Sequence, residues 1–223
     1  MPSSTSSSER RIPDGNWRAT WLATMIVVIG AIWALELVTR AHGQRPSVVD
    51  DPVSWSIARR SVDDDPRVVV FIGASRMVVG YSSDAFAKAA PGLRGVQLAI
   101  EGASPFGVLS DLAGDDRFRG VVVLDMIEWD VGGPTAFDDA RPYVQRSHAL
   151  WRAPGALANR TLAGLAQSEL AVLAIGSHRF LSSLLGRARW PQPAWVVADR
   201  DRVSHADYSL AEPAALNRKR DNR

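Results

Sequence analysis

An uninterrupted apolar segment near the start of the chain constrains the fold more than any other feature. Residues 19–38 read ATWLATMIVVIGAIWALELV and carry a single charge, on Glu36. About 20 apolar residues are enough for a helix to cross a hydrocarbon core of roughly 30 Å. Glu36 lies near the end of the segment, where a carboxylate can reach the interface at lower cost than at the centre. We therefore predict one transmembrane helix over residues 19–38.

The charges on either side of this segment favour one orientation. Three arginines precede it, whereas two arginines and then two aspartates follow it. Positively charged residues collect on the cytoplasmic side of a membrane. The apolar run is too long for a typical signal-peptide core, and Thr39-Arg40-Ala41 is a poor cleavage site. We expect an uncleaved signal anchor in a bacterial inner membrane, single-pass, with the following domain facing the periplasm or the exterior.

The composition indicates a folded domain after the anchor. The chain has 223 residues, of which 46% are hydrophobic and 22% charged. The net charge is only +2 and no basic stripe carries interleaved aromatic residues, so no nucleic-acid partner is expected. The absence of cysteine excludes disulfides and thiol catalysis. No histidine pair has metal-ligand spacing and no glycine-rich phosphate loop is found, so we expect neither a metal nor a cofactor.

The middle of the chain alternates short apolar runs with helical segments. Runs of β-branched residues predict strands over 68–72, 96–100 and 120–125, and helices are predicted over 83–90 and 105–113. This alternation indicates an α/β domain with a parallel sheet and right-handed crossovers. Beyond it we predict a long surface loop or lid over 128–154, helices over 156–175 and 177–185, and a strand over 195–199.

These features divide the chain into five segments. We predict a cytoplasmic tail over 1–18, the signal anchor over 19–38, a juxtamembrane linker over 39–66, an α/β domain over 67–210 and a disordered basic tail over 211–223. The linker includes a short helix near Trp55 and the acidic run Asp63–Asp65, which is expected to be solvated.

The candidate site lies where the predicted strands end, because open α/β sheets bind ligands at the carboxyl ends of their strands. The sequence Gly73-Ala74-Ser75-Arg76 follows the first strand directly. A serine in such a turn is exposed, and nearby backbone N–H groups can hold an oxyanion. Serine is a weak nucleophile without a base, usually a histidine oriented by a carboxylate. The alternative is that Ser75 caps the following helix and Gly73 only permits the turn.

Two of these motifs resemble a known family. The run Val69–Gly80, VVFIGASRMVVG, is similar to the first block of membrane-anchored SGNH (GDSL-like) proteins, some of which resemble the O-acetyltransferases of bacterial exopolysaccharide systems. The sequence Gly102-Ala103-Ser104-Pro105 resembles their second block, and the resemblance covers residues 67–129. It implies a flavodoxin-like, SGNH-type three-layer parallel sheet, complete or shortened, that follows the transmembrane helix.

The resemblance also implies roles for individual residues. Ser75 would be the nucleophile, its own N–H and that of Gly102 would form the oxyanion hole, and Arg76 and Ser104 would bind substrate. Two positions depart from the family pattern. The expected asparagine after the third strand is replaced by the acidic residues Asp125, Glu128 and Asp130. The nearest match to the final block pairs Asp201 with His205, one residue further apart than the family places them.

The sequence therefore leaves three functions open. The first is a serine esterase or O-acyltransferase that acts on envelope glycan or lipid acyl groups. The second is a catalytically incomplete domain that acts as a binding or accessory subunit of an envelope polysaccharide system. The third is a truncated relative without a function of its own. Expected partners are the membrane, an envelope polysaccharide or acyl donor, and a membrane acyltransferase. The remaining histidines, His42, His148 and His178, are expected in surface or capping positions.

Overall fold

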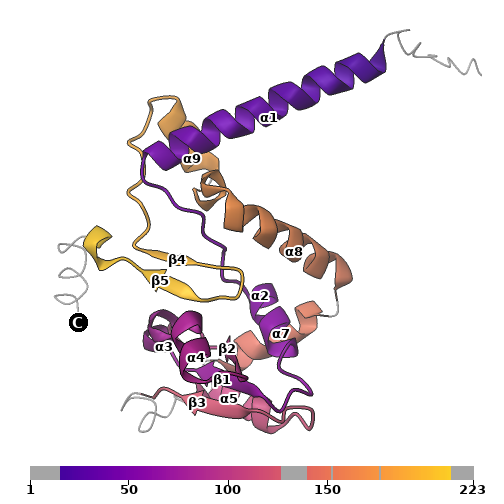
Figure 1. Ribbon diagram of the computed structural model, residues 1–223, viewed down its shortest axis with the longest axis vertical. Coiled ribbons are helices and arrows are strands. Elements are labelled where there is room, and N and C mark those ends of the chain that lie inside the picture. The colour runs from indigo at the N-terminus through magenta and orange to yellow at the C-terminus, as the bar shows by residue number, and fades with distance from the viewer. Residues whose placement is uncertain (1–15, 127–139, 152, 176, 212–223) are drawn as a thin grey trace, which may run out of the picture.

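The computed structural model describes residues 16–126, 140–151, 153–175 and 177–211. Figure 1 shows a small α/β unit at one end of the molecule and the long helix α1 (Trp17–Ala41) projecting from the other end. Helices α8 (Pro154–Glu169) and α9 (Ser177–Leu184) and a β-hairpin lie between them.

Helix α1 extends beyond the predicted segment at both ends. Asn16 caps its first turn by accepting a hydrogen bond from the Ala19 amide. Its apolar side chains lie in the open: Trp21, Val27 and Trp33 are 68%, 69% and 64% exposed. The predicted apolar helix is confirmed, and by length and composition it is the one helix in the described residues that is able to cross a membrane.

The carboxyl end of α1 is docked onto the domain by Glu36. This carboxylate is buried, and it accepts hydrogen bonds from the amides of Ala171 (2.9 Å) and Val172 (3.0 Å) at the start of the 3-10 helix η1 (Ala171–Ala174). Arg40 donates to Glu36 (2.6 Å) and to the carbonyl of Glu169 (2.8 Å). The one charge in the apolar segment is therefore bound by protein groups.

Three strands form a parallel sheet in the order β2-β1-β3, with β1 (Val68–Ile72) between β2 (Arg94–Gln97) and β3 (Val121–Leu124). Val70 lies opposite Val96 on one side and Val122 on the other. The predicted mixed α/β class with a parallel sheet is thus confirmed. Residues 98–100, predicted as part of the second strand, continue the β1 ladder through the Leu98 and Ile100 amides.

One face of the sheet carries the hydrophobic core. Val68, Val70 and Ile72 are fully buried there, against α2 (Pro52–Arg60), α5 (Phe106–Ala113) and α7 (Arg141–Trp151). Trp55 of α2 is fully buried and donates its indole N–H to the carbonyl of Leu98 (3.1 Å). The short helix predicted near Trp55 is confirmed, and this part of the predicted linker packs into the core.

The other face of the sheet is covered by α3 (Ser75–Gly80) and α4 (Ser83–Ala89). The Phe71 ring lies 4.5 Å from Tyr81 and 5.2 Å from Phe86, measured between ring centroids. A Cβ on Gly95 of β2 would lie 2.2 Å from the Tyr81 hydroxyl, so only glycine fits beneath these rings. Helices on both faces give the domain three layers.

Two helices differ from the sequence prediction. Helix α7 occupies residues that were predicted as part of a loop over 128–154. The loop was predicted because the apolar positions of this segment, which include Val144, are too few to give a clear helical period. Residues 128–139 of that loop lie outside the described residues. The helix predicted over 156–175 ends at Glu169, and η1 follows after Leu170, which is extended.

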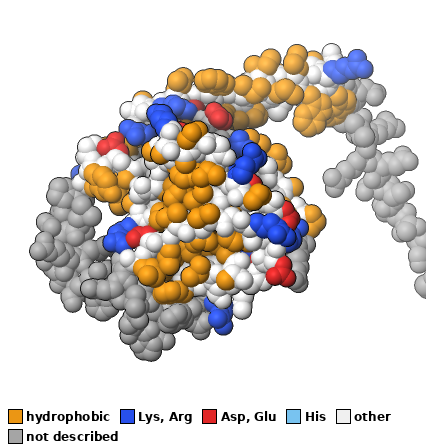
Figure 2. All heavy atoms as spheres, turned by 60° about the horizontal axis from the view of Figure 1, so that its bottom comes forward, with side chains coloured by type: hydrophobic (Ala, Val, Ile, Leu, Met, Phe, Trp, Pro, Cys, Tyr) orange, Lys and Arg blue, Asp and Glu red, His pale blue; other side chains and the backbone are white. Residues whose placement is uncertain are grey.

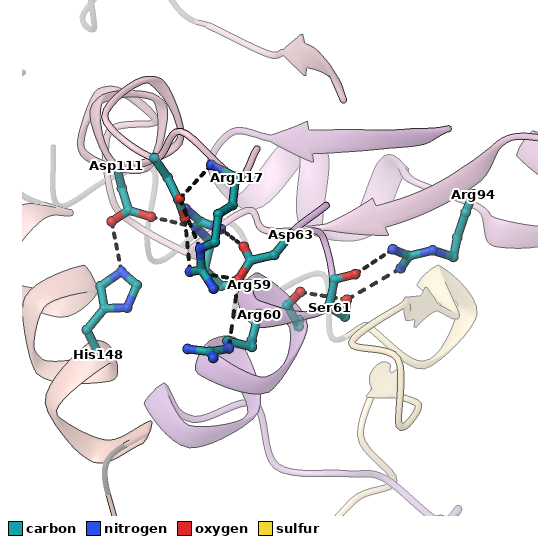
Figure 3. A network of polar contacts seen from close by, with 10 residues as sticks. Arg59, Arg60, Ser61, Asp63, Arg94, Asp111, Arg117 and His148 are labelled. Atoms are coloured by element: carbon teal, nitrogen blue, oxygen red, sulfur yellow. Dashed lines mark hydrogen bonds and ion pairs between the residues drawn. The ribbon is translucent and has the colours of Figure 1, made fainter. Parts of the chain in front are cut away.

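A buried arginine joins α2 to α5 at the amino end of the sheet (Figure 3). Arg59, 3% exposed, donates to Asp111 (2.6 Å), Asp63 (2.9 Å) and Asp115 (2.9 Å). Burial alone would lower the pKa of Arg59, but its hydrogen bonds and ion pairs with Asp111 and Asp115 raise that pKa above its ordinary value. Asp63 is only 7% exposed and also pairs with Arg117 (2.8 Å), so the prediction of a solvated acidic run is wrong for Asp63.

Strands β4 (Val196–Ala198) and β5 (Ser204–Ala206) form an antiparallel hairpin, of which only β4 was predicted. Arg202 in its turn has a left-handed φ of +63° and a side chain that is 4% exposed. Its guanidinium holds Asp50 through two hydrogen bonds (2.6 and 2.8 Å) and donates to the carbonyls of Gln97 (2.9 Å) and Ala99 (3.0 Å). These contacts fasten the hairpin to the open edge of β2.

Strand β3 is the opposite edge of the sheet. Its Val121 and Val123 side chains are 59% and 39% exposed, because α3 and α4 cover β1 and β2 but not this strand. Figure 2 shows the α/β end of the molecule, where hydrophobic side chains gather between scattered charged residues.

Candidate functional site

The predicted nucleophile lies in a tight turn at the carboxyl end of β1. Gly73 and the extended residue Ala74 lead into α3, and Ser75 is the first residue of that helix, with an exposed side chain. Ala74 occupies the N-cap position and provides no side-chain cap. Ser75 is therefore not the cap of α3, which was the alternative interpretation of this motif.

Gly73 is required by the close approach of its neighbours. A Cβ at this position would lie 2.8 Å from the Met77 Cβ and 3.1 Å from the Asp125 Cβ. Gly73→Ala should therefore lower the free energy of unfolding by about 1–3 kcal/mol, as overpacking does. Gly80→Ala is the matched control, because a Cβ there meets nothing within 4 Å and alanine favours a helix. Urea unfolding of both variants measures the difference, and equal stabilities would contradict this account of the turn.

The turn is joined to the end of β3 by an ion pair. Arg76 holds both carboxylate oxygens of Asp125, with Nε to Oδ2 at 3.2 Å, and donates to the carbonyl of Met126 (2.9 Å). Arg76, predicted to bind substrate, is thus engaged with Asp125, which stands where SGNH proteins have an asparagine. The pair compensates the Asp125 charge at this end of the sheet. Glu128 and Asp130 lie outside the described residues.

The segment after β2 contributes the second part of this edge. Gly102 is exposed and adopts a φ of +72°, a conformation that favours glycine. The Ile100 amide donates to the Gly73 carbonyl (3.1 Å), which ties this segment to the Ser75 turn. Ser104 is 7% exposed, and its hydroxyl has no hydrogen-bond partner among the described residues.

The predicted base and its carboxylate lie on the hairpin. Strand β5 packs beside α3, so His205 comes from a neighbouring element. Its side chain is 64% exposed, however, and Nε2 lies 3.7 Å from Asp199 Oδ2. Asp201 is exposed in the turn, where its amide donates to Asp199 (2.9 Å). Among the described residues no hydrogen bond joins His205 to Ser75 or to Asp201, so a serine–histidine–aspartate relay is not assembled.

A cavity of about 420 Å³ lies away from Ser75, at the open edge of β2. We call it the β2-edge cavity; it is lined by the β2 residues 94–97, by α2, by α8 and by the hairpin turn 200–203. The amides of Arg94 and Leu98 point toward β1, where they bind the carbonyls of Arg67 and Phe71. Residues alternate along a strand, so the backbone groups of Gly95 and Gln97 point away from β1, toward this edge.

Arginines and hydroxyl groups line the β2-edge cavity. Arg160 donates to the Ser54 hydroxyl (2.5 Å) and pairs with Asp51 (3.3 Å), while Arg94 donates to the Ser61 carbonyl (2.5 Å). Burial raises the pKa of Tyr81, and the charges of Asp199 and Asp201 add to this, so its hydroxyl stays protonated. The cavity thus offers hydrogen-bond donors whose charges are largely compensated by aspartates.

Two of the other histidines, His42 and His148, are exposed, as predicted for surface positions. His148 Nε2 lies 2.8 Å from Asp111 Oδ1 at the margin of the Arg59 network (Figure 3). His42 stacks on Trp190 with ring centroids 4.1 Å apart. The side chain of His178 lies outside the described residues.

Comparison with protein-family models, curated proteins and solved structures finds no match for this chain. The resemblance to SGNH proteins therefore depends on the motifs around Ser75 and Gly102 alone.

The sequence did not point to the residues of the β2-edge cavity. Arg202 lies between Asp201 and His205, which resemble a catalytic block, and Arg160 lies within a predicted helix, so neither position indicated a buried arginine. The alternating charges of Asp199-Arg200-Asp201-Arg202 were the available signal, since such a turn can bury one arginine against a sheet edge.

Proposed function

We propose that this chain is a membrane-anchored, SGNH-like accessory domain that binds an envelope polysaccharide outside the cytoplasm. The observation that carries the proposal is the β2-edge cavity, whose volume of about 420 Å³ lies within the range of small-ligand sites, about 300–1,000 Å³. Its arginines, hydroxyls and outward-facing strand backbone suit a ligand rich in hydroxyl and carboxyl groups. Helix α1 supports the membrane location, and the absence of a hydrogen bond between His205 and Ser75 in the described residues favours binding over catalysis.

Filling the cavity tests this proposal. Gly164 of α8 lines the cavity, and a Cβ there meets nothing within 4 Å. Gly164→Leu should therefore lower the affinity for the ligand at least tenfold, about 1.4 kcal/mol, without unfolding the helix. Calorimetric titration of the full chain in detergent with hexuronic acid and N-acetylhexosamine oligosaccharides, each with and without O-acetyl groups, measures the loss.

Gly155→Leu is the matched control. Gly155 is an exposed residue of the same helix, a Cβ there also meets nothing within 4 Å, and it does not line the cavity. This variant and Ser75→Ala should bind as the natural chain does. Failure of the natural chain to bind any of the oligosaccharides, or equal loss in both glycine variants, would overturn the proposal.

A second candidate is a serine esterase or O-acyltransferase. It is favoured by the exposed Ser75 at the end of β1 and by the left-handed Gly102 on the neighbouring segment, which together resemble a nucleophile with an oxyanion hole. A fluorophosphonate probe separates the two candidates. Labelling that disappears in Ser75→Ala but persists in Ser110→Ala, an exposed serine of α5, would establish the enzyme. If the folded chain is not labelled, the esterase or acyltransferase candidate is excluded and the binding domain remains as the proposed function.

A further inference from the structure

We propose that α9 and the residues after it form an interfacial element that lies on the surface of an anionic phospholipid bilayer. The inference concerns a surface distinct from the β2-edge cavity, and it depends on the proposed membrane anchoring of α1. The surface consists of Leu181, Leu184, Leu185, Arg187 and Arg189.

The position of α9 beside the end of α1 carries the argument. His42, the residue that follows α1, stacks on Trp190, and the Trp190 ring lies 5.8 Å from Phe180 of α9. Phe180 is 7% exposed, so one face of α9 is held against this stack. Val38 is the last residue of the apolar segment, and it precedes His42 by about 6 Å along the helix axis at 1.5 Å per residue. Helix α9 is therefore fixed near the level at which α1 would leave the hydrocarbon.

The other face of α9 is apolar and uncovered. Leu181, Leu184 and Leu185 are 55%, 45% and 62% exposed. Their spacing of three and four residues places them on one side of the helix. Leu173 of η1, which packs against α1, is also 45% exposed. An apolar helix face next to a transmembrane segment is able to bury its leucines at the headgroup boundary.

The charges around this face match an anionic surface. Arg187 and Arg189 are exposed, and neither forms an ion pair within the described part of the chain. Arg40, near the end of α1, pairs with the buried Glu36 and donates to the carbonyl of Glu169 at the end of α8. Arginines beside an apolar face favour negatively charged lipids, and each arginine adds its own share to the free energy of binding to an anionic surface.

Spin labelling of single cysteines tests this contact, since the chain has no cysteine of its own. The full chain would be placed in nanodiscs of phosphatidylethanolamine and phosphatidylglycerol, labelled at Leu184→Cys, Leu93→Cys or Val27→Cys. Leu93 is the matched control, because it is 45% exposed like Leu184 but precedes β2, at the far end of the domain. Val27, in the middle of α1, reports the anchor itself.

We expect a several-fold higher ratio of oxygen to nickel-chelate accessibility at Leu184 than at Leu93, with the highest ratio at Val27. Replacing both Arg187 and Arg189 with glutamine should reduce the ratio at Leu184 toward the value found in phosphatidylcholine nanodiscs. If the accessibility ratio at Leu184 equals that at Leu93 while the ratio at Val27 shows a lipid environment, the interfacial contact is overturned and the anchor remains. An aqueous reading at Val27 would overturn the anchor, and the contact with it.

Discussion

Replacing Arg59 with methionine should lower the free energy of unfolding by about 3–5 kcal/mol, as the loss of one partner from a buried ion pair does. The arginine is 3% exposed and holds three carboxylates, of which Asp63 is 7% exposed. Methionine can fill the volume but leaves these carboxylates without their shared donor. Pulse proteolysis of the full chain in detergent across a urea series measures the change.

The size of this effect should depend on pH. The pKa of Asp115 lies below its ordinary value because hydrogen bonds from Arg117 and Arg59 outweigh the opposing effect of burial. A depressed folded-state pKa contributes stability above the unfolded value of about 3.9, and this contribution is lost as the pH falls through the folded value. The difference between the natural chain and Arg59→Met should therefore be largest above about pH 5 and should shrink below about pH 4.

Arg67→Met is the control for this substitution. Arg67 is 76% exposed and lies 4.0 Å from Asp65, so its loss should change stability by no more than about 0.5 kcal/mol. Asp111→Asn in the Arg59→Met background should restore part of the lost stability, because it removes the charge of one carboxylate that has lost its arginine partner. A cost for Arg59→Met as small as that for Arg67→Met would show that the network contributes little.

Replacing Arg202 with methionine should cost about 3 kcal/mol, within the range for breaking a buried pair. The substitution leaves Asp50 without its partner and the carbonyls of Gln97 and Ala99 without a donor. It also removes the attachment of the hairpin to the edge of β2. Hydrogen exchange should therefore become faster over residues 196–206 before the sheet itself unfolds, and urea unfolding should give the overall loss.

Two variants define the cause of this loss. Arg200→Met removes an exposed neighbouring arginine that has no ion pair among the described residues, and it should change stability by less than about 0.5 kcal/mol. Arg202→Lys keeps the charge but cannot hold Asp50 and two carbonyls at once, so its stability should lie between those of the natural chain and Arg202→Met. Unchanged exchange over residues 196–206 in Arg202→Met would contradict the proposed attachment.

The sequence predicted the elements whose patterns are local. The β-branched run Val68–Ile72 forms the predicted strand, and the apolar segment 19–38 lies within the longer helix α1. Helix α7 and strand β5 were missed because their residues are held by contacts with distant segments. The hydroxyl of Ser56, for example, donates to the carbonyl of Ser147 in α7.

The candidate site divides in the same way. The Ser75 turn could be predicted because a strand, a glycine and a serine are adjacent in the chain. The β2-edge cavity could not, since its walls come from β2, α2, α8 and the hairpin turn, which are brought together by Arg202 and Arg160. The role of Arg202 depends on a sheet edge about a hundred residues away in sequence, at Gln97.

The buried Glu36 has a consequence for how far the domain can reach. A domain on a flexible tether samples many heights above a bilayer, whereas this one is held to its helix by a carboxylate that binds two amides and an arginine. Where α1 spans a membrane, the β2-edge cavity and Ser75 are then kept at a set distance from the lipid. The domain would then select ligands by their height above the bilayer as well as by their chemistry.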